Sequence, residues 1–251
     1  MPRRHSRAMS YATLNQQEIV ATIARLHRRI SERFPDANLA RVAADLVEVG
    51  DQHAANVQRV LRADWRLRAV SAVFLVLGIG ALALLLASVR SYEPENVDLI
   101  ALLQSVESGL SMLFLLAASV VLLTSLELRR KRRRCLQALH ELRALAHVVD
   151  MHQLTKDPDH ALHPGASTTS SPVRQMTPFE LTRYLDYCTE MLALMGKLAA
   201  LYAQSFHDPE AIAAVDAIED LTTGLSRKIW QKIMILEERR SEAPGSARPE
   251  Q

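Results

Sequence analysis

The sequence predicts an all-α membrane protein, in which a two-span transmembrane helical hairpin carries a cytoplasmic helical bundle. The first observation is a pair of runs without any charged residue, Ala69–Val89 and Ser108–Leu126. At about 1.5 Å per residue, such helices reach roughly 31 and 28 Å, which is close to the hydrocarbon thickness of a bilayer. The second observation is a 4-3 spacing of apolar residues elsewhere in the chain, and the third is the lack of alternating β-branched runs. The alternative is a buried core helix, which is usually shorter and is not bracketed by basic clusters.

These patterns divide the chain into consecutive segments. In order, they are a flexible N-terminus (1–12), cytoplasmic helices (13–68), transmembrane helix 1 (69–90), a short external loop (91–106), transmembrane helix 2 (107–127), a cytoplasmic extension helix (128–154), a linker (155–177), a C-terminal helical hairpin (178–240) and a flexible tail (241–251). The linker contains three prolines and many Ser and Thr residues, which predicts a mobile connection.

The charges that flank the two runs predict the orientation. Arginines precede the first run, the sequence RRKRRR follows the second, and the loop 91–106 is acidic and lacks Lys and Arg, with Arg90 as the one discordant charge. Positive residues near a span tend to stay on the cytoplasmic side, so we expect both termini in the cytoplasm. Residues 1–30 contain no apolar core, which predicts that the first span is an uncleaved insertion signal. Abundant Ala, Leu and Arg suit a bacterial protein, and the expected location is therefore the inner (cytoplasmic) membrane, with two passes.

The N-terminal helix is expected to start at a capping box made by Thr13 and Gln16. It should end near Phe34, because the residue before Pro35 avoids helical geometry. Its apolar residues recur at helical spacing: Ile19, Ile23, Leu26 and Ile30.

A second helix is expected to be capped by Asp36 and to run without a proline as far as Glu93, straight into the first span. Trp65 should then lie near the lipid headgroups. The apolar stripe of this helix is made of Leu39, Val42, Leu46, Val49, Val57, Val60 and Leu61. His53 lies within the stripe.

After the turn at Pro94, Asn96 or Asp98 can start a helix that meets no proline before Asp157. Beyond the basic run this helix has an apolar seam typical of helix–helix packing: Cys135, Leu139, Leu142, Ala146 and Val149. The cysteines Cys135 and Cys188 are expected to be reduced and to serve as small core residues.

Thr177-Pro178-Phe179-Glu180 predicts a strong helix start, with threonine as the cap, proline in the first position and glutamate bonding back. Apolar residues follow at Leu181, Leu185, Cys188, Leu192, Met195, Ala199, Tyr202 and Phe206. Asp208-Pro209-Glu210 should close this helix and start another, whose core face is Ile212, Val215, Ile218, Leu221, Leu225, Ile229, Ile233 and Leu236. So short a turn predicts an antiparallel pair.

Two candidate sites accompany the spans. The basic run is interpreted as a topology signal and as an anionic-lipid contact, formed by Arg129, Arg130, Lys131, Arg132, Arg133 and Arg134. It lacks the aromatic and polar groups that read bases, so we expect no nucleic-acid partner. Small residues in the first span can bring helices together, either inside the hairpin or between protomers: Gly78, Gly80, Ala83 and Ala87.

A zone rich in histidine offers weak candidates for metal ligands, but we expect no metal site and no cofactor. His147 and Asp150 lie three residues apart and can share a helix face, whereas His152 lies about 140° away from His147. His160 and His163 follow in the linker. Solvated histidines at a helix end are the simpler interpretation, although segment 147–158 is where we would expect any docking or regulatory site.

The leading functional hypothesis is a membrane-anchored interaction, scaffold or regulatory protein without catalytic activity, which binds a protein partner or copies of itself. No phosphate loop, nucleophile elbow, zinc-protease or C-x-x-C motif occurs in the sequence. One alternative is an oligomeric pore or membrane-perturbing protein lined by Ser111, Ser119 and Thr124. A second alternative is a metal-dependent enzyme or sensor that uses His147, Asp150 and His152.

Overall fold

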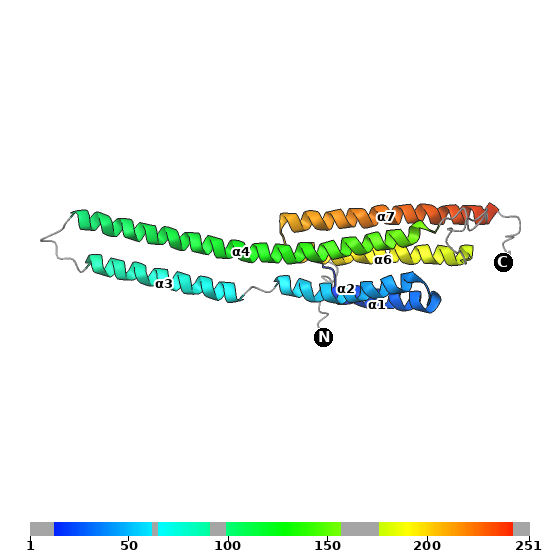
Figure 1. Ribbon diagram of the computed structural model, residues 1–251, viewed down its shortest axis with the longest axis horizontal. Coiled ribbons are helices and arrows are strands. Elements are labelled where there is room, and N and C mark those ends of the chain that lie inside the picture. Colours follow the sequence, from blue (N-terminus) through cyan, green and yellow to red (C-terminus); the bar gives the residue numbers. More distant parts are fainter. Residues whose placement is uncertain (1–12, 62–64, 91–98, 157–175, 243–251) are drawn as a thin grey trace, which may run out of the picture. The chain divides into compact units, whose positions relative to one another are not determined.

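The computed structural model describes residues 13–61, 65–90, 99–156 and 176–242, which form helices and no strand. The helices are α1 (Gln16–Arg33), α2 (Asn38–Leu61), α3 (Trp65–Arg90), α4 (Leu99–Leu154), α6 (Pro178–Ser205) and α7 (Pro209–Glu242), as labelled in Figure 1. The prediction of an all-α fold is confirmed for these residues. The chain divides into two compact units, one made of residues 1–61 with 134–251 and the other made of residues 62–133. The predicted flexible ends, most of the linker and the first part of the loop at 91–98 lie outside the described residues.

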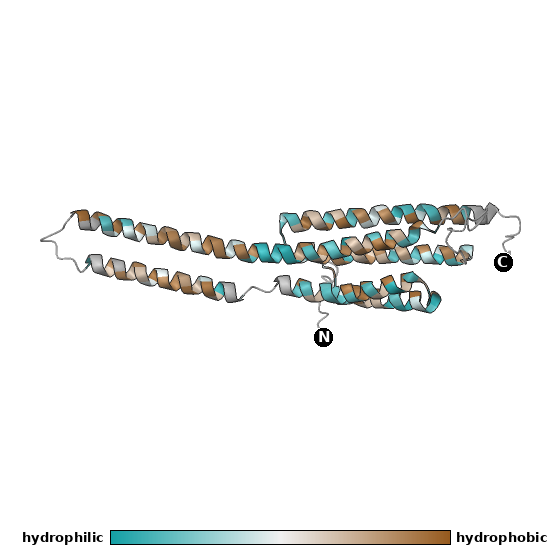
Figure 2. Ribbon diagram, viewed as in Figure 1, coloured by the Kyte–Doolittle hydropathy of each residue, from teal (hydrophilic) through white to brown (hydrophobic). Residues whose placement is uncertain are grey.

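The unit made of residues 62–133 contains the apolar runs. One described helical segment, Leu103–Leu154, is long and apolar enough to cross a membrane, and its most apolar part is almost entirely unburied. The apolar stretch described in α3, Arg68–Leu84, is shorter. Figure 2 shows hydrophobic residues around most of α3 and the first part of α4, and a hydrophilic stretch where the basic run lies. Among the described residues, length and composition thus support one candidate span, and the second span stays a prediction.

Helix α1 is capped by Asn15 and not by the predicted Thr13. The side chain of Asn15 accepts hydrogen bonds from the backbone N–H groups of Gln17 (3.0 Å) and Glu18 (3.4 Å). Asparagine is at least as good an N-cap as threonine, and Asn15 directly precedes the first helical residue, so the Thr13 prediction is wrong. The predicted end at Phe34 and the four buried apolar positions are confirmed.

Helix α2 begins at Asn38, two residues beyond the predicted cap Asp36, because Pro35–Ala37 form a turn first. The Ala40 N–H then donates to the Ala37 carbonyl at 3.0 Å. The first part of the predicted stripe is buried, and His53 is fully buried within it. The predicted continuation from α2 into the apolar run crosses residues 62–64, which lie outside the described residues.

Helix α4 is continuous from Leu99 to Leu154, and all five residues of its predicted seam are buried. Its C-terminal carbonyl groups are met by a lysine from α7. Lys232 Nζ donates to the Gln153 carbonyl (3.1 Å), to Gln153 Oε1 (2.7 Å) and to the Lys156 carbonyl (3.4 Å). A cation at this end of a helix is favourable because the helix dipole is negative there.

Helices α6 and α7 form the predicted antiparallel pair, which lies side by side in Figure 1. The capping box at Thr177 is confirmed: its hydroxyl oxygen accepts from the Glu180 N–H while the Glu180 side chain accepts from the Thr177 N–H. Asp208 caps α7 as expected, accepting from the N–H groups of Glu210 (3.1 Å) and Ala211 (3.2 Å).

One apolar core joins α1, α2, the last part of α4, α6 and α7. Both cysteines are buried in it and unpaired, as expected. The apolar seams therefore close within a single chain.

Candidate interaction sites

The basic run Arg129–Arg134 follows the most apolar part of α4 directly. Four of its members are exposed: Arg129, Arg130, Arg133 and Arg134. Lys131 is half-buried, and its Nζ lies 3.0 Å from Glu127 Oε1. The Nε atom of Arg68, from α3, lies 3.9 Å from Glu127 Oε2. At about 100° per residue the exposed arginines cover about 140° of the helix surface, a wide cationic arc suited to binding anionic groups.

The predicted small-residue strip is not used uniformly. Gly78 is buried, and a Cβ atom added there would overlap the side chain of Leu116 of α4. Gly80 has nothing within 4 Å of such an atom, and Ala83 and Ala87 are exposed. Gly78 thus allows α3 and α4 to approach each other inside this unit, while the other three positions face outward.

We expect Gly78→Ala to weaken the packing of α3 against α4 by about 1–3 kcal/mol, because the end of the Leu116 side chain must move out of the way. Gly80→Ala is the matched control and should not weaken it, since the added methyl group meets only open space. Energy transfer between dyes on Arg90→Cys and Leu103→Cys, followed through an SDS titration, measures the separation of the two helices. If Gly78→Ala and Gly80→Ala separate α3 from α4 at the same SDS concentration, the contact between Gly78 and Leu116 is contradicted.

The hydroxyl groups of α4 considered for a pore lining are partly engaged by their own helix. Ser119 Oγ donates to the Leu115 carbonyl at 2.8 Å, and Thr124 Oγ1 lies 2.9 Å from the Val120 carbonyl. Such back-bonding satisfies a hydroxyl group inside an apolar helix. The geometry adds no support for a polar pore lining.

The weak metal candidates do not come together. Among the described residues, no group of three His, Cys, Asp or Glu side chains is placed to hold a metal ion. His147 is exposed, and Asp150 Oδ1 accepts a hydrogen bond from Gln153 Nε2 at 2.7 Å. His160 and His163 lie outside the described residues.

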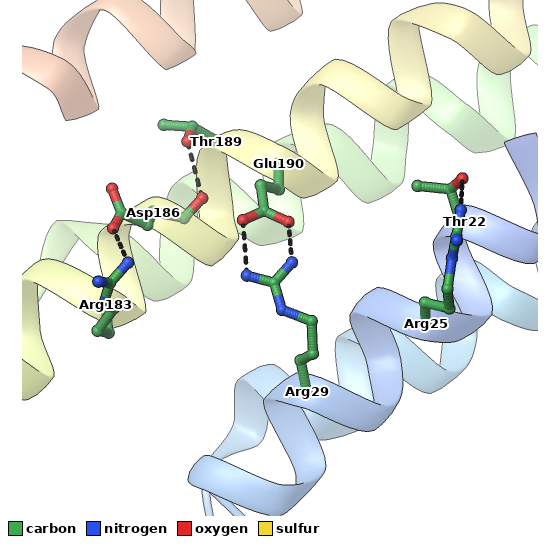
Figure 3. Close-up of polar contacts among 7 residues, drawn as sticks. All are labelled: Thr22, Arg25, Arg29, Arg183, Asp186, Thr189 and Glu190. Atoms are coloured by element: carbon green, nitrogen blue, oxygen red, sulfur yellow. Dashed lines mark hydrogen bonds and ion pairs between the residues drawn. The ribbon is translucent and has the colours of Figure 1, made fainter.

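A polar seam connects α1 to α6. Figure 3 shows the side chain of Arg29 reaching from α1 to Glu190 on α6, where two nitrogen–oxygen contacts of 2.7 and 3.2 Å form a fork. The hydrogen bonds that Arg29 donates to Glu190 raise the pKa of Arg29. The Arg29 guanidinium also lies 5.2 Å from the ring centre of Tyr187. A half-exposed ion pair contributes little free energy, so this seam orients α1 on α6 more than it stabilises the contact.

Large apolar side chains are exposed at the end of the bundle where α4 ends and α6 begins. On α7, Trp230 and Met234 lie one turn apart and are 52% and 61% exposed. Lys232, which contacts the end of α4, lies between them in sequence but on the other side of α7, because two residues correspond to about 200° of helix. Met151 and Leu154, in the segment 147–158 where a docking site is expected, and Phe179 of α6 are exposed as well, but they are not on the same face. We call Trp230 and Met234 the apolar end patch. The sequence did not indicate it, because helical spacing identifies the buried stripe but not which outward residues remain uncovered.

A buried polar cluster lies where α2, α4 and α6 meet. The rings of His53 and Tyr202 pack edge to face, with centres 5.5 Å apart, and both side chains are fully buried. Neither nitrogen of His53 nor the hydroxyl of Tyr202 has a hydrogen-bond partner among the described residues. Glu141 Oε2 of α4 lies 3.9 Å from His53 Nε2. Burial lowers the pKa of His53 to about 4. The only signal of this site in the sequence is a histidine within an apolar stripe.

In the part of the chain that the structure describes, the fold and these sites define a helical protein with a five-helix bundle and one helix long and apolar enough to cross a membrane. No family model, no curated protein and no solved structure matches the chain.

Proposed function

We propose that this protein is a membrane-anchored helical interaction module without catalytic activity, located in the inner (cytoplasmic) membrane of a bacterium. The observation that carries the proposal is α4, a single helix that contains both the apolar segment and one wall of the bundle core. A helix built this way ties a folded bundle to the bilayer. The bundle has an apolar core of its own, so its remaining surface is available for binding.

In this proposal α3 supplies a second span, and the hairpin leaves both termini in the cytoplasm. The arginines before α3 and after the apolar part of α4 support that orientation, because positive residues favour the cytoplasmic side. The exposed arginines at 129–134 would contact anionic lipid headgroups, each contributing roughly 1 kcal/mol near the surface.

The apolar end patch is the surface that we propose for the protein partner. Isolated apolar side chains are common on protein surfaces, but a group that includes an exposed tryptophan resembles the anchors of protein interfaces. The residues of the apolar seams are buried in the core, whereas these side chains are not covered by any described residue.

Photo-crosslinking in intact cells tests this proposal. A benzoylphenylalanine placed at Trp230 or Met234 should give a protein adduct, whereas the same group at the exposed His140 of α4 should not. The mass of the adduct distinguishes a second copy of the 28.0 kDa chain from another protein. Absence of any adduct at both patch positions, or an equal yield at His140, would contradict the proposed surface.

A further inference from the structure

The cluster around His53 lies between the α1–α2 hairpin and the rest of the bundle. His53 belongs to α2, while Tyr202 comes from α6 and Glu141 from α4. One turn earlier on α2, the nearest atoms to a Cβ added at Gly50 belong to Ile23 of α1 and Leu198 of α6, both apolar. The fully buried histidine thus packs on an aromatic ring, with one half-exposed carboxylate 3.9 Å away, and the adjacent turn of α2 lies against apolar side chains.

This enclosure accommodates a neutral imidazole far better than a charged one. Protonation adds a positive charge and a second N–H donor to a ring that already has no hydrogen-bond partner among the described residues. Among the described residues Glu141 is the opposite charge near the ring, but its contact is long and its side chain is 44% exposed, so water screens the attraction.

We propose that protonation of His53 releases the α1–α2 hairpin from α4 and α6, so that the docking of this hairpin depends on pH. The inference concerns the bundle alone and stands apart from the proposed function. When the hairpin leaves, the imidazolium gains water and both of its N–H groups gain partners. The released surfaces of α4 and α6 then expose apolar residues that the docked hairpin covers.

The sign of the effect follows from the two pKa values. In the docked state the pKa of His53 is about 4, whereas an open, hydrated imidazole has a pKa near 6.5. Between these values the open state binds more protons, so docking is strongest above pH 6.5 and weakens as the pH falls toward 4. From pH 7.5 to pH 5, these two pKa values imply that the docking equilibrium weakens about 30-fold.

Tyr202 of the cluster, and Cys135, which interacts with Tyr202 electrostatically, do not ionise in this pH range. Burial raises the pKa of Cys135 to about 11 and also raises the pKa of Tyr202. Both groups therefore stay neutral at every pH between 4 and 8. His53 is the buried member of the cluster that titrates under mildly acidic conditions.

Amide hydrogen exchange of the full-length protein in detergent micelles tests the proposal. After correction for intrinsic exchange rates, protection of amides in residues 16–61 should fall about 30-fold between pH 7.5 and pH 5. Protection of α6 and α7 should change far less. In His53→Leu the loss should disappear, whereas the control His140→Leu, at an exposed position of the adjoining α4, should behave as the wild type does. An undiminished loss in His53→Leu, or no loss in the wild type, would overturn the proposal.

A second measurement covers the case in which His53→Leu does not fold. Imidazole NMR resonances of histidine-labelled wild-type protein report the titration of His53 directly. A pKa well below 6, accompanied by loss of protection in residues 16–61, supports the proposal. An ordinary pKa near 6.5 with residues 16–61 protected throughout would refute it.

Discussion

In a chain whose α3 carries Leu77→Lys and Leu84→Lys, so that only α4 can anchor it, the double substitution Leu115→Lys with Leu122→Lys is expected to release the chain from the membrane. Leu115 and Leu122 lie seven residues apart in the most apolar part of α4, and they are 67% and 61% exposed, so the change does not disturb internal packing. A lysine in place of leucine near the centre of a span costs about 3 kcal/mol of insertion free energy, and two such changes cost about 6 kcal/mol. Ultracentrifugation of carbonate-washed membranes, followed by immunoblotting of pellet and supernatant, measures the release.

The matched control places the same charges on the same helix within the bundle. In the same background, Gln137→Lys with Ala144→Lys also introduces two exposed lysines seven residues apart, and this variant should remain in the pellet because α4 still anchors it. If the wild-type chain itself stays in the supernatant without detergent, α4 is not a membrane span and the proposed anchor is wrong.

The substitution Leu192→Asp is expected to unfold the bundle. Leu192 of α6 is fully buried in the core. Losing its packing costs about 2–5 kcal/mol, and burying a carboxyl group adds a further penalty of about 1–3 kcal/mol or more. Folded domains are stable by only about 5–15 kcal/mol, so this single change removes a large share of the total.

The two native cysteines report the outcome, because Cys135 and Cys188 are both buried. Mass spectrometry after brief maleimide treatment should find no modified thiol in the wild type and both thiols modified in Leu192→Asp. The neighbouring Ala193→Asp introduces the same side chain at an exposed position and should leave both cysteines protected, with a cost below about 1 kcal/mol. Protected cysteines in Leu192→Asp would show that the core is not assembled as described.

Local signals in the sequence predicted most of the helices. Capping chemistry is read from neighbouring residues, which is why Thr177 and Asp208 were assigned correctly. The same reasoning failed at Thr13, because Asn15 offers a competing cap two residues later. Apolar spacing identified the buried face of α6 well, but Ile212 and Leu221 of α7 are only half-buried. Spacing describes one helix alone, whereas burial also depends on where the neighbouring helices end.

The candidate sites are harder to predict from the sequence, because they depend on contacts between residues far apart in the chain. The pairing of Arg29 with Glu190 joins residues 161 positions apart, and no local pattern indicates it. His53 was visible as a polar residue within an apolar stripe, but its lack of hydrogen-bond partners follows from the residues that α4 and α6 place around it. The histidines at 147 and 152 looked more functional because they lie close together in sequence, and helix geometry does not bring them together with Asp150 into a metal site.

The bundle is built from two separate stretches of the chain, residues 1–61 and 134–251. Ribosomes add roughly 5–20 residues per second, so Glu190 emerges roughly 10–30 s after its partner Arg29. During that interval α1 and α2 have no α6 to cover their apolar faces. The nascent amino-terminal hairpin thus waits with Ile19, Ile23 and Leu39 unshielded, which makes it a natural client for a chaperone during synthesis.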